Sequence, residues 1–566
     1  MECQGSAESP PQGWPFDYAQ GKPLWKRALL CLGSCVLLGL SFPKADIGLV
    51  AWVSLVPLAW SLRGASAKEA AVCGGIFGFV LTFVLVYFIG LFGFLPLVLL
   101  AIYQAAFFAI LGVIWSVFLS RGGAAAVLGP AAVWAGLEWA RSLGPLGHTF
   151  GALGYTQHAI LPVAQVARIG AVYAVSFVVV AVNVGIAEAI WPRPGKKEET
   201  PGAGALLAAR RVEALIPGVL LLLSMGYGWM VMGLAARDGA PVLRVAAIQP
   251  NPRLSFYSST PAEIRTDLRQ HVQMTVALRG WQPDLIAWPE TAITGSLFAG
   301  ETFRDVVRAA RDSGADLLVG STERGPDAVL GQPAEIFNRA WMISSDGKIL
   351  GYYDKVKLVL FGEYVPFRHG LGFILKRYPI RSFDYSPGEG IVVFGMERYT
   401  LGVAICFEEL QPTMLRDACR QGADVLAVIT NDGWFKKTSA AKHLAHICVF
   451  RAIENGAPLV RAAKTGISCI IDKCGRVLDT SGVFVEAQVK APVSLRSGAT
   501  PYQVVGDLFA ILCLVGAGAG LGLCVFKPDW GLRLPCFRRN ADSQRRLPLF
   551  GDRGKWLPWR KGGGSR

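Results

Sequence analysis

The sequence predicts a polytopic α-helical membrane bundle of about eight spans that carries an inserted extracytoplasmic α/β domain. The composition is the first observation, because 52% of the residues are hydrophobic, only 17% are charged, and the mean hydropathy is +0.40. A water-soluble enzyme usually contains more charge. The second observation is a change of pattern near Val242, where long apolar runs give way to short ones that alternate with charged segments. A chain of 566 residues is long enough for both parts.

The apolar runs define the membrane part. Most approach the roughly 20 residues that a helix needs to cross a bilayer. A cleaved signal peptide is not expected, because further runs follow the first one immediately. The predicted spans are Ala28–Phe42, Ile47–Leu62, Ala70–Phe92, Leu95–Leu119, Ala124–Ala140, Ala164–Trp191, Ala214–Ala235 and Gly506–Phe526.

Basic residues in the loops predict the orientation. The formal net charge is +15, and most of the cations between spans fall on one side if the N-terminus is cytoplasmic. This topology explains the charge, so no nucleic acid partner is expected, although the tail could contact anionic lipid. The predicted organisation is a cytoplasmic segment (1–27), a transmembrane bundle (28–236), an extracytoplasmic domain (237–503), a last span (504–526) and a basic cytoplasmic tail (527–566).

Short apolar runs and longer charged segments alternate through the inserted domain, which is typical of sheets covered by helices. In such folds, reactive groups lie at strand ends and in the loops that follow. The expected strands are Val242–Ile248, Leu285–Trp288, Leu317–Gly320, Ala340–Ser344, Gly402–Ile405 and Val425–Thr430. The expected helices are Pro261–Leu278, Phe303–Ser313, Thr413–Gln421 and Lys442–Asn455.

Three strand-end residues suggest an acyl-transfer centre. Cys406 ends a small, apolar run and is followed at once by acidic residues. Glu290 follows Trp-Pro, so a partly shielded carboxyl group in a turn is available as a general base. Lys355 follows another apolar run, and a cation beside a thiol lowers the thiol pKa and stabilises an oxyanion. The sequence therefore predicts Cys406 as nucleophile.

Each of these residues also has an ordinary alternative. Cys406 could be a buried core residue, as most of the 12 cysteines are expected to be. Glu290 could be a surface carboxylate and Lys355 a solvated lysine. Glu363, in a Gly-Glu-Tyr-Val-Pro turn, could hold Lys355, steer an incoming amine, or serve only the turn.

Metal binding is not expected. His443 and His446 with Cys448 resemble a metal-ligand spacing, but no second ligand cluster accompanies them in the sequence. The sequence has six histidines and none stands beside Cys406, which disfavours a Cys–His pair. No phosphate-binding glycine loop is evident, and the prediction is that the protein uses no cofactor.

The motifs together carry a family resemblance. Trp288-Pro289-Glu290, Asp354-Lys355 and Ile405-Cys406-Phe407-Glu408 resemble the Glu–Lys–Cys triad of the nitrilase, or carbon–nitrogen hydrolase, superfamily. The membrane spans narrow the resemblance to the apolipoprotein N-acyltransferase family. Supporting stretches are Phe361–Pro366, Thr430–Phe435, Arg451–Glu454, Glu138-Trp139 and Gly154-Tyr155. Two departures are Phe407, where the family usually has Tyr, and Thr465-Gly466, where Asn-Gly is expected.

This resemblance implies the roles of individual residues. Glu290 is expected to be the base, Lys355 the oxyanion stabiliser and Cys406 the nucleophile, with support from Glu363, Glu408 and the backbone N–H of Phe407. Phe361, Trp434, Glu138 and Tyr155 are expected to contact lipid or substrate. The inserted domain is expected to form an αββα sandwich on the periplasmic face of a bacterial inner membrane.

The resemblance also implies the partners. The expected acyl donor is a phospholipid, the acceptor is a diacylated apolipoprotein, and the protein acts in the bilayer as a monomer. Lifting a chain of about sixteen carbons into water costs roughly 12 kcal/mol, which favours a thiol placed at the membrane edge. The nearest alternative is a membrane-tethered amidase of the nitrilase type that hydrolyses small amides. A transporter or sensor with a ligand-binding external domain is a second alternative, in which Cys406 has no chemical role.

Overall fold

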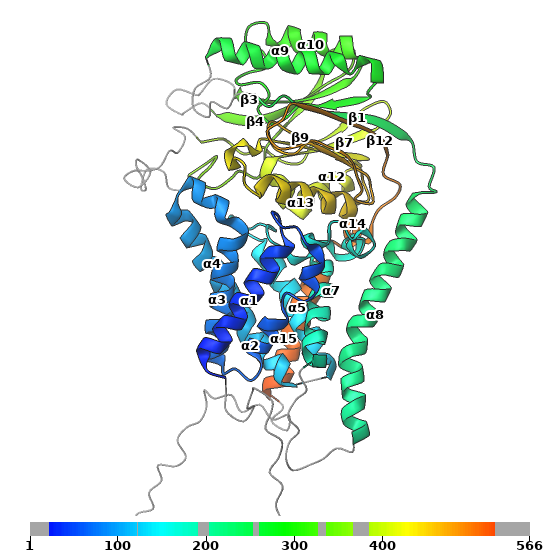
Figure 1. The fold of residues 1–566 in the computed structure, drawn as a ribbon. Helices are drawn as coiled ribbons and strands as arrows, with labels where there is room; N and C mark the ends of the chain where they lie inside the picture. Colours follow the sequence, from blue (N-terminus) through cyan, green and yellow to red (C-terminus); the bar gives the residue numbers. More distant parts are fainter. Residues whose placement is uncertain are drawn as a thin grey trace, which may run out of the picture.

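Two parts form the molecule, a helical bundle and an α/β domain that lies on one end of it (Figure 1). The computed structural model describes residues 22–121, 123–190, 203–252, 260–325, 335–365 and 384–526. The predicted tail at 527–566, and most of the predicted N-terminal segment at 1–27, lie outside these residues.

The bundle contains long helices joined by short turns. Its elements are α1 (Leu24–Ser41), η1 (Gly48–Trp52), α2 (Val56–Leu62), α3 (Ala67–Val86), η2 (Tyr87–Phe92), α4 (Phe94–Arg121), α5 (Gly123–Arg141), η3 (Leu153–Gln157), α6 (Leu161–Ala164), α7 (Ala167–Ile190), α8 (Ala203–Ala235) and α15 (Leu508–Phe526). Figure 1 shows α8 running along the side of the bundle up to the α/β domain.

The predicted number of eight spans is wrong. Among the described residues, five helices are long and apolar enough to cross a membrane, at Leu24–Ser41, Ala67–Phe92, Phe94–Arg121, Ala167–Ile190 and Ala214–Ala235. The chain is a multi-pass membrane protein, but three of the predicted spans do not meet this standard.

Local structure explains each difference. The predicted span Ile47–Leu62 is divided between η1 and α2, neither of which approaches the length of a bilayer crossing. α5 contains Pro130 and the buried polar residues Glu138 and Arg141, which lower its apolar character. The apolar stretch of α15, Leu508–Cys524, is shorter than the five candidates.

Two six-stranded sheets form the centre of the α/β domain. The first has the order β12-β1-β2-β3-β4-β5 and the second the order β11-β10-β9-β8-β7-β6. The strands are β1 (Val242–Gln249), β2 (Leu285–Ala287), β3 (Asp316–Arg324), β4 (Ile336–Ile343), β5 (Ile349–Asp354), β6 (Val393–Gly395), β7 (Thr400–Ile405), β8 (Val425–Thr430), β9 (Leu459–Ala463), β10 (Cys469–Ile471), β11 (Val477–Thr480) and β12 (Ala487–Ser494). Central neighbours pair in parallel, as β1 with β2 and β7 with β8.

Helices cover the outer face of each sheet. The remaining elements are α9 (Pro261–Ala277), η4 (Arg279–Trp281), α10 (Thr302–Ser313), η5 (Cys406–Leu410), α12 (Pro412–Arg420), η6 (Asp432–Phe435), α13 (Ala440–Asn455) and α14 (Pro501–Val505). In Figure 1, α9 and α10 lie on the side away from the bundle, and α12 and α13 lie between the second sheet and the bundle. This layering agrees with the expected αββα sandwich.

Buried apolar side chains fill each space between layers. One cluster, with Ala247, Ala340 and Ile405, lies between the two sheets. Another lies between the first sheet and helices α9 and α10. The third continues from α12 and α13 into the helices of the bundle, so the two parts share one apolar core.

Candidate active site

Three strand ends bring Glu290, Lys355 and Cys406 together. Glu290 follows β2 and Lys355 follows β5, so the first sheet supplies both, whereas Cys406 follows β7 of the second sheet. All three are buried, with exposed fractions of 6%, 1% and 7%. The site therefore forms only when the two sheets pack against each other.

A tight turn presents Glu290. Strand β3 passes directly behind this turn at Gly320, where a Cβ atom would lie 2.4 Å from the carbonyl oxygen of Pro289. Glycine is needed there because no side chain fits at that distance. The neighbouring Trp288 is fully buried, and its indole N–H donates to the hydroxyl of Thr275 at 2.8 Å. The packed turn leaves Glu290 little freedom to move.

Lys355 lies between two carboxylates. Its Nζ donates to Glu363 Oε1 at 2.8 Å and lies 3.7 Å from Glu290 Oε1. Burial alone lowers the pKa of Lys355, but the charges of Glu363, of Cys406 in its thiolate form and of Glu290 outweigh it and raise the pKa above its ordinary value. Lys355 is therefore an ammonium ion at every physiological pH.

Cys406 begins the turn η5 with φ of +57°. This left-handed conformation is uncommon outside glycine and is typical of strained turns at functional sites. Burial raises the pKa of the Cys406 thiol well above its ordinary value, and Glu290 raises it further. Lys355 and a hydrogen bond with Thr430 act in the opposite direction. The resting group is a neutral thiol, so its reaction requires a base.

Glu408 ties the two sheets together beside these residues. Its fully buried carboxylate accepts hydrogen bonds from the backbone N–H groups of Ile405 at 2.7 Å and Val356 at 2.8 Å. It also accepts from the hydroxyl of Tyr353 at 2.8 Å. Because Ile405 precedes Cys406 and Val356 follows Lys355, one side chain fixes both strand ends.

A buried ion cluster behind the Cys406 turn was not predicted from the sequence. The guanidinium of Arg461, on β9, pairs with Glu409 at 2.9 Å and with Asp432 at 3.0 Å. All three side chains are enclosed, and the thiol of Cys448 donates to Glu409 at 2.9 Å. A charged residue inside an apolar strand was the available signal, since such a charge needs a partner.

The departure at Thr465-Gly466 leaves the glycine in place. A Cβ atom at Gly466 would lie 2.0 Å from Asp432 Oδ2, so the loop approaches the Arg461 cluster too closely for any side chain. Thr465, the residue that replaces the expected Asn, is buried.

Aromatic side chains connect the Cys406 turn with the bundle. The ring centroid of Phe407 lies 5.9 Å from that of Phe435, which in turn lies 5.2 Å from that of Phe88 in η2. Trp434 is half-buried in the same turn, η6. Phe361 follows Lys355 in the chain and is 50% exposed.

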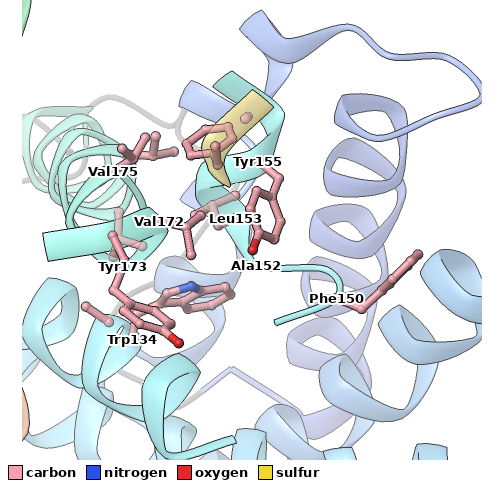
Figure 2. Packing of buried hydrophobic residues seen from close by; sticks show 14 of the residues in the cluster. Trp134, Phe150, Ala152, Leu153, Tyr155, Val172, Tyr173 and Val175 are labelled. Atoms are coloured by element: carbon pink, nitrogen blue, oxygen red, sulfur yellow. The ribbon is translucent and has the colours of Figure 1, made fainter. Parts of the chain in front are cut away.

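Glu138 and Tyr155 do not lie on a lipid-facing surface. Both are buried, and Glu138 accepts hydrogen bonds from Trp134 at 2.7 Å and from the backbone of Leu153 at 2.8 Å. The Tyr155 hydroxyl accepts from Arg451 of α13 at 2.8 Å. Figure 2 shows Leu153 and Tyr155 packed beside Val172 of α7. Tyr155 therefore joins the bundle to the α/β domain, whereas these bonds of Glu138 lie within the bundle. The predicted contact of both residues with substrate stays a prediction.

The histidines of α13 also serve this junction. His443 stacks between Phe42 and Phe150, with centroid distances of 5.4 Å and 4.8 Å. His446 stacks on His158 at 3.5 Å, and both rings lie near Asp46, whose carboxylate pairs with Lys442 at 2.8 Å. Cys448 faces Glu409 instead, so the spacing seen in the sequence does not gather these three side chains at one point.

The arrangement has the parts for nucleophilic acyl transfer. It contains the thiol of Cys406, the carboxylate of Glu290, whose charge acts on that thiol, and the buried ammonium ion of Lys355, whose charge acts on both. A buried cation stabilises the negative oxygen of a tetrahedral intermediate more strongly than a solvated one.

Comparison with known proteins supports the same chemistry. Residues 34–185 match the family described as "Apolipoprotein N-acyltransferase N-terminal domain", and residues 244–497 match "Carbon-nitrogen hydrolase". The apolipoprotein N-acyltransferase of Geobacter metallireducens is 32% identical over 86% of this chain and 93% of its own length. The chain belongs to the apolipoprotein N-acyltransferase family. Its function is apolipoprotein N-acyl transfer, and it is an acyltransferase.

Other relatives agree with this assignment. The apolipoprotein N-acyltransferases of Rhizobium rhizogenes and Pseudomonas syringae are 30% and 29% identical over 85% and 88% of this chain, which correspond to 92% and 97% of their own lengths. A solved structure of the amidase from Nesterenkonia sp. AN1 is 19% identical and covers 47% of this chain and 94% of that chain, with a TM-score of 0.34.

Proposed function

We propose that the protein transfers a fatty acyl chain from a phospholipid to the α-amino group of a diacylglyceryl-cysteine through a thioester on Cys406. Glu290 takes the thiol proton as the sulfur attacks the donor ester. Lys355 and the backbone N–H of Phe407 stabilise the oxyanion. Lysophospholipid leaves with a proton returned by Glu290, and the thioester remains.

The second half of the reaction uses the same groups. The free amine of the acceptor attacks the thioester, and Glu290 takes a proton from the amine. As the C–S bond of the tetrahedral intermediate breaks, Glu290 returns this proton to the sulfur, which regenerates the thiol. The product is an amide, which is more stable than the ester it replaces, so no energy source is needed. Glu363 holds Lys355 in place, and Glu408 holds the strand ends.

The observation that carries this proposal is the position of the buried thiol. Cys406 is coupled to Glu290 and Lys355 and lies on the sheet whose covering helices pack against the membrane bundle. A small-amide hydrolase has no need of such a position, whereas a lipid substrate does, since moving its chain through water costs about 0.8 kcal/mol per CH₂.

The decisive experiment is mass spectrometry of the full chain in detergent after incubation with phospholipid. We expect an acyl adduct on Cys406 that hydroxylamine removes and that a diacylated lipopeptide discharges as an N-acyl product. Cys406→Ala should form no adduct, whereas Cys419→Ala, which removes another buried thiol of the same domain, should behave as the parent. Hydrolysis of small amides without an adduct from phospholipid would support the amidase alternative.

Phe361 and Trp434 are proposed lipid contacts. The exposed ring of Phe361 follows Lys355, and Trp434 lies in the turn whose neighbour Phe435 packs on the bundle. In the same assay, Phe361→Asp should slow acylation by phospholipid and leave the reaction of Cys406 with a soluble alkylating agent unchanged. Equal acylation of parent and variant would remove Phe361 from the proposal.

We further propose that the protein acts as a monomer, with the α/β domain on the periplasmic face of the inner membrane. The basic residues near the bundle ends support this orientation through the positive-inside rule. Labelling of Asp346→Cys, at an exposed position, with an impermeant maleimide in spheroplasts checks the side.

A further inference from the structure

A buried asparagine on β4 contacts both carboxylates of the site. Asn338 Nδ2 donates to Glu290 Oε1 at 2.7 Å and approaches Glu363 Oε1 at 3.4 Å. The side chain is 1% exposed, and the backbone carbonyl of the same residue accepts the N–H of Lys355 at 2.9 Å. Asn338 therefore touches three of the groups that surround Cys406.

The distances show that the two carboxylates have different hydrogen-bond donors. Lys355 lies 2.8 Å from Glu363 but 3.7 Å from Glu290, beyond hydrogen-bond range. The short bond to Glu290 comes from the neutral amide instead. Without that donor, the buried Glu290 carboxylate would draw the ammonium of Lys355 toward itself. That movement would displace the cation from its present place beside Glu363.

We propose that Asn338 is a positioning residue, whose amide holds the Glu290 carboxylate in place and apart from Lys355 so that Glu290 can accept the proton of Cys406. This inference deepens the proposed function and rests on it. A lysine in this place would neutralise the base, and an aspartate would add a third negative charge. A neutral amide donates a hydrogen bond without doing either.

The surroundings fix the orientation of the amide. Both neighbouring carboxylates only accept hydrogen bonds when ionised, so the NH₂ group must face them and the Oδ1 atom must face away. Oδ1 is buried and has no hydrogen-bond partner among the described residues. Pairing of β4 with β3, where Asn338 faces Thr322, holds the backbone in register.

The test is the pH dependence of Cys406 alkylation in the full chain, which needs no lipid. The probe is iodoacetamide, with the modified residue located by mass spectrometry, and the variant is Asn338→Leu, which keeps the size but removes the donor. Without the amide donor, the ammonium of Lys355 moves toward Glu290 and stabilises the Cys406 thiolate less. In Asn338→Leu we expect the midpoint of the rate profile to rise by about one to two pH units. Below the midpoint, this corresponds to a rate about 10- to 100-fold lower than that of the parent.

Two further variants define the outcome. Asn338→Asp should move the midpoint in the same direction, because a third carboxylate favours the protonated form of Cys406. This variant replaces the leucine variant in the test if the latter fails to fold. Ser321→Ala removes a buried hydroxyl from the adjacent strand that donates to Glu323 and accepts from Trp341, and it should leave the midpoint unchanged. A uniform loss of rate with an unmoved midpoint would indicate a structural role and overturn the inference.

Failure of this inference differs from failure of the proposed function. The alkylation profile concerns only the pair of Glu290 and Cys406, whereas the proposed function requires an acyl adduct from phospholipid. A shifted midpoint without such an adduct in the parent would retain Asn338 as a positioning residue and reject the lipid chemistry.

Discussion

The two sheets of the α/β domain face different surroundings. In α10, which covers the first sheet, only Val306, Ala309, Ala310 and Ser313 are buried. In α13, which covers the second sheet, all but two of the 16 residues are buried. The first helix has one side in water, and the second lies between its sheet and the bundle (Figure 1).

Helix α13 has no solvated face, and its outward polar groups bind the bundle directly, as Glu454 does when it accepts the N–H of Val172 at 3.0 Å. The sheet beneath α13 supplies Cys406, and the other sheet supplies Glu290 and Lys355. The thiol is therefore fixed relative to the bundle, and the Glu290 carboxylate and the Lys355 ammonium are held beside it by the contact between the sheets.

The largest effect on stability is expected when the buried Arg461 of the second sheet is replaced, and Arg339 of the first sheet provides the comparison. Arg461→Met would leave Glu409 and Asp432 enclosed without a cation, and we expect a loss of about 3–5 kcal/mol in the free energy of unfolding. Arg339→Met, in the first sheet, breaks a more accessible pair with Asp354 and should cost about 1 kcal/mol. Denaturant unfolding in detergent measures both.

Equal losses in the two variants would contradict this comparison, because they would mean that water reaches the Arg461 cluster as easily as the Arg339 pair. The activity of the Arg461 variant should fall as well, since Glu409 lies within the Cys406 turn. The Arg339 variant should retain activity, because the guanidinium that it loses pairs with Asp354 and lies 3.6 Å from the ring centroid of Tyr352.

The pattern of apolar runs in the sequence was sufficient to predict the type of fold and the strand-end positions of three site residues. Glu290, Lys355 and Cys406 each follow a strand-like run, so their positions at strand ends were predictable from chain order. Asn338 was not predictable, because its bond to Glu290 spans 48 positions and an asparagine in a strand has no distinctive pattern. The number of spans was overestimated because an apolar run does not reveal where a helix breaks, as between η1 and α2.

The junction under α13 should weaken when one hydroxyl is removed. Tyr155 donates to Thr149 at 2.7 Å and accepts from Arg451 at 2.8 Å. In Tyr155→Phe the buried guanidinium loses this acceptor, at a cost of about 1–3 kcal/mol. Hydrogen exchange should become faster in α13 and stay unchanged in α10.

Tyr399→Phe is the matched control for that variant. It also removes a buried hydroxyl, one that donates to Asp316 at 2.9 Å between the sheets, but it leaves the junction intact. Exchange in α13 should therefore remain at the parental rate. If both variants change α13 equally, the protection of this helix reflects the stability of the whole domain and not its contact with the bundle.

The smallest effect at neutral pH is expected at His443, in the same junction. Burial lowers the pKa of His443 to about 4, against an ordinary value of 6.5. Above pH 6.5 its contribution to stability is complete, because both the folded and the unfolded forms are neutral. As the pH falls from 6.5 toward 4 only the unfolded form gains a proton, so stability is lost by up to about 1.4 kcal/mol per pH unit.

His443→Phe should remove that loss while keeping the stack between Phe42 and Phe150. The thermal midpoints of variant and parent should agree closely at pH 7.5, and the variant should become relatively more stable with each step toward pH 4.5. Parallel curves over this range would mean that His443 takes up its proton in the folded protein as easily as in the unfolded chain. The ring would then have to reach water beside Asp46 and Lys442, and the second sheet would be less firmly joined to the bundle than its burial indicates.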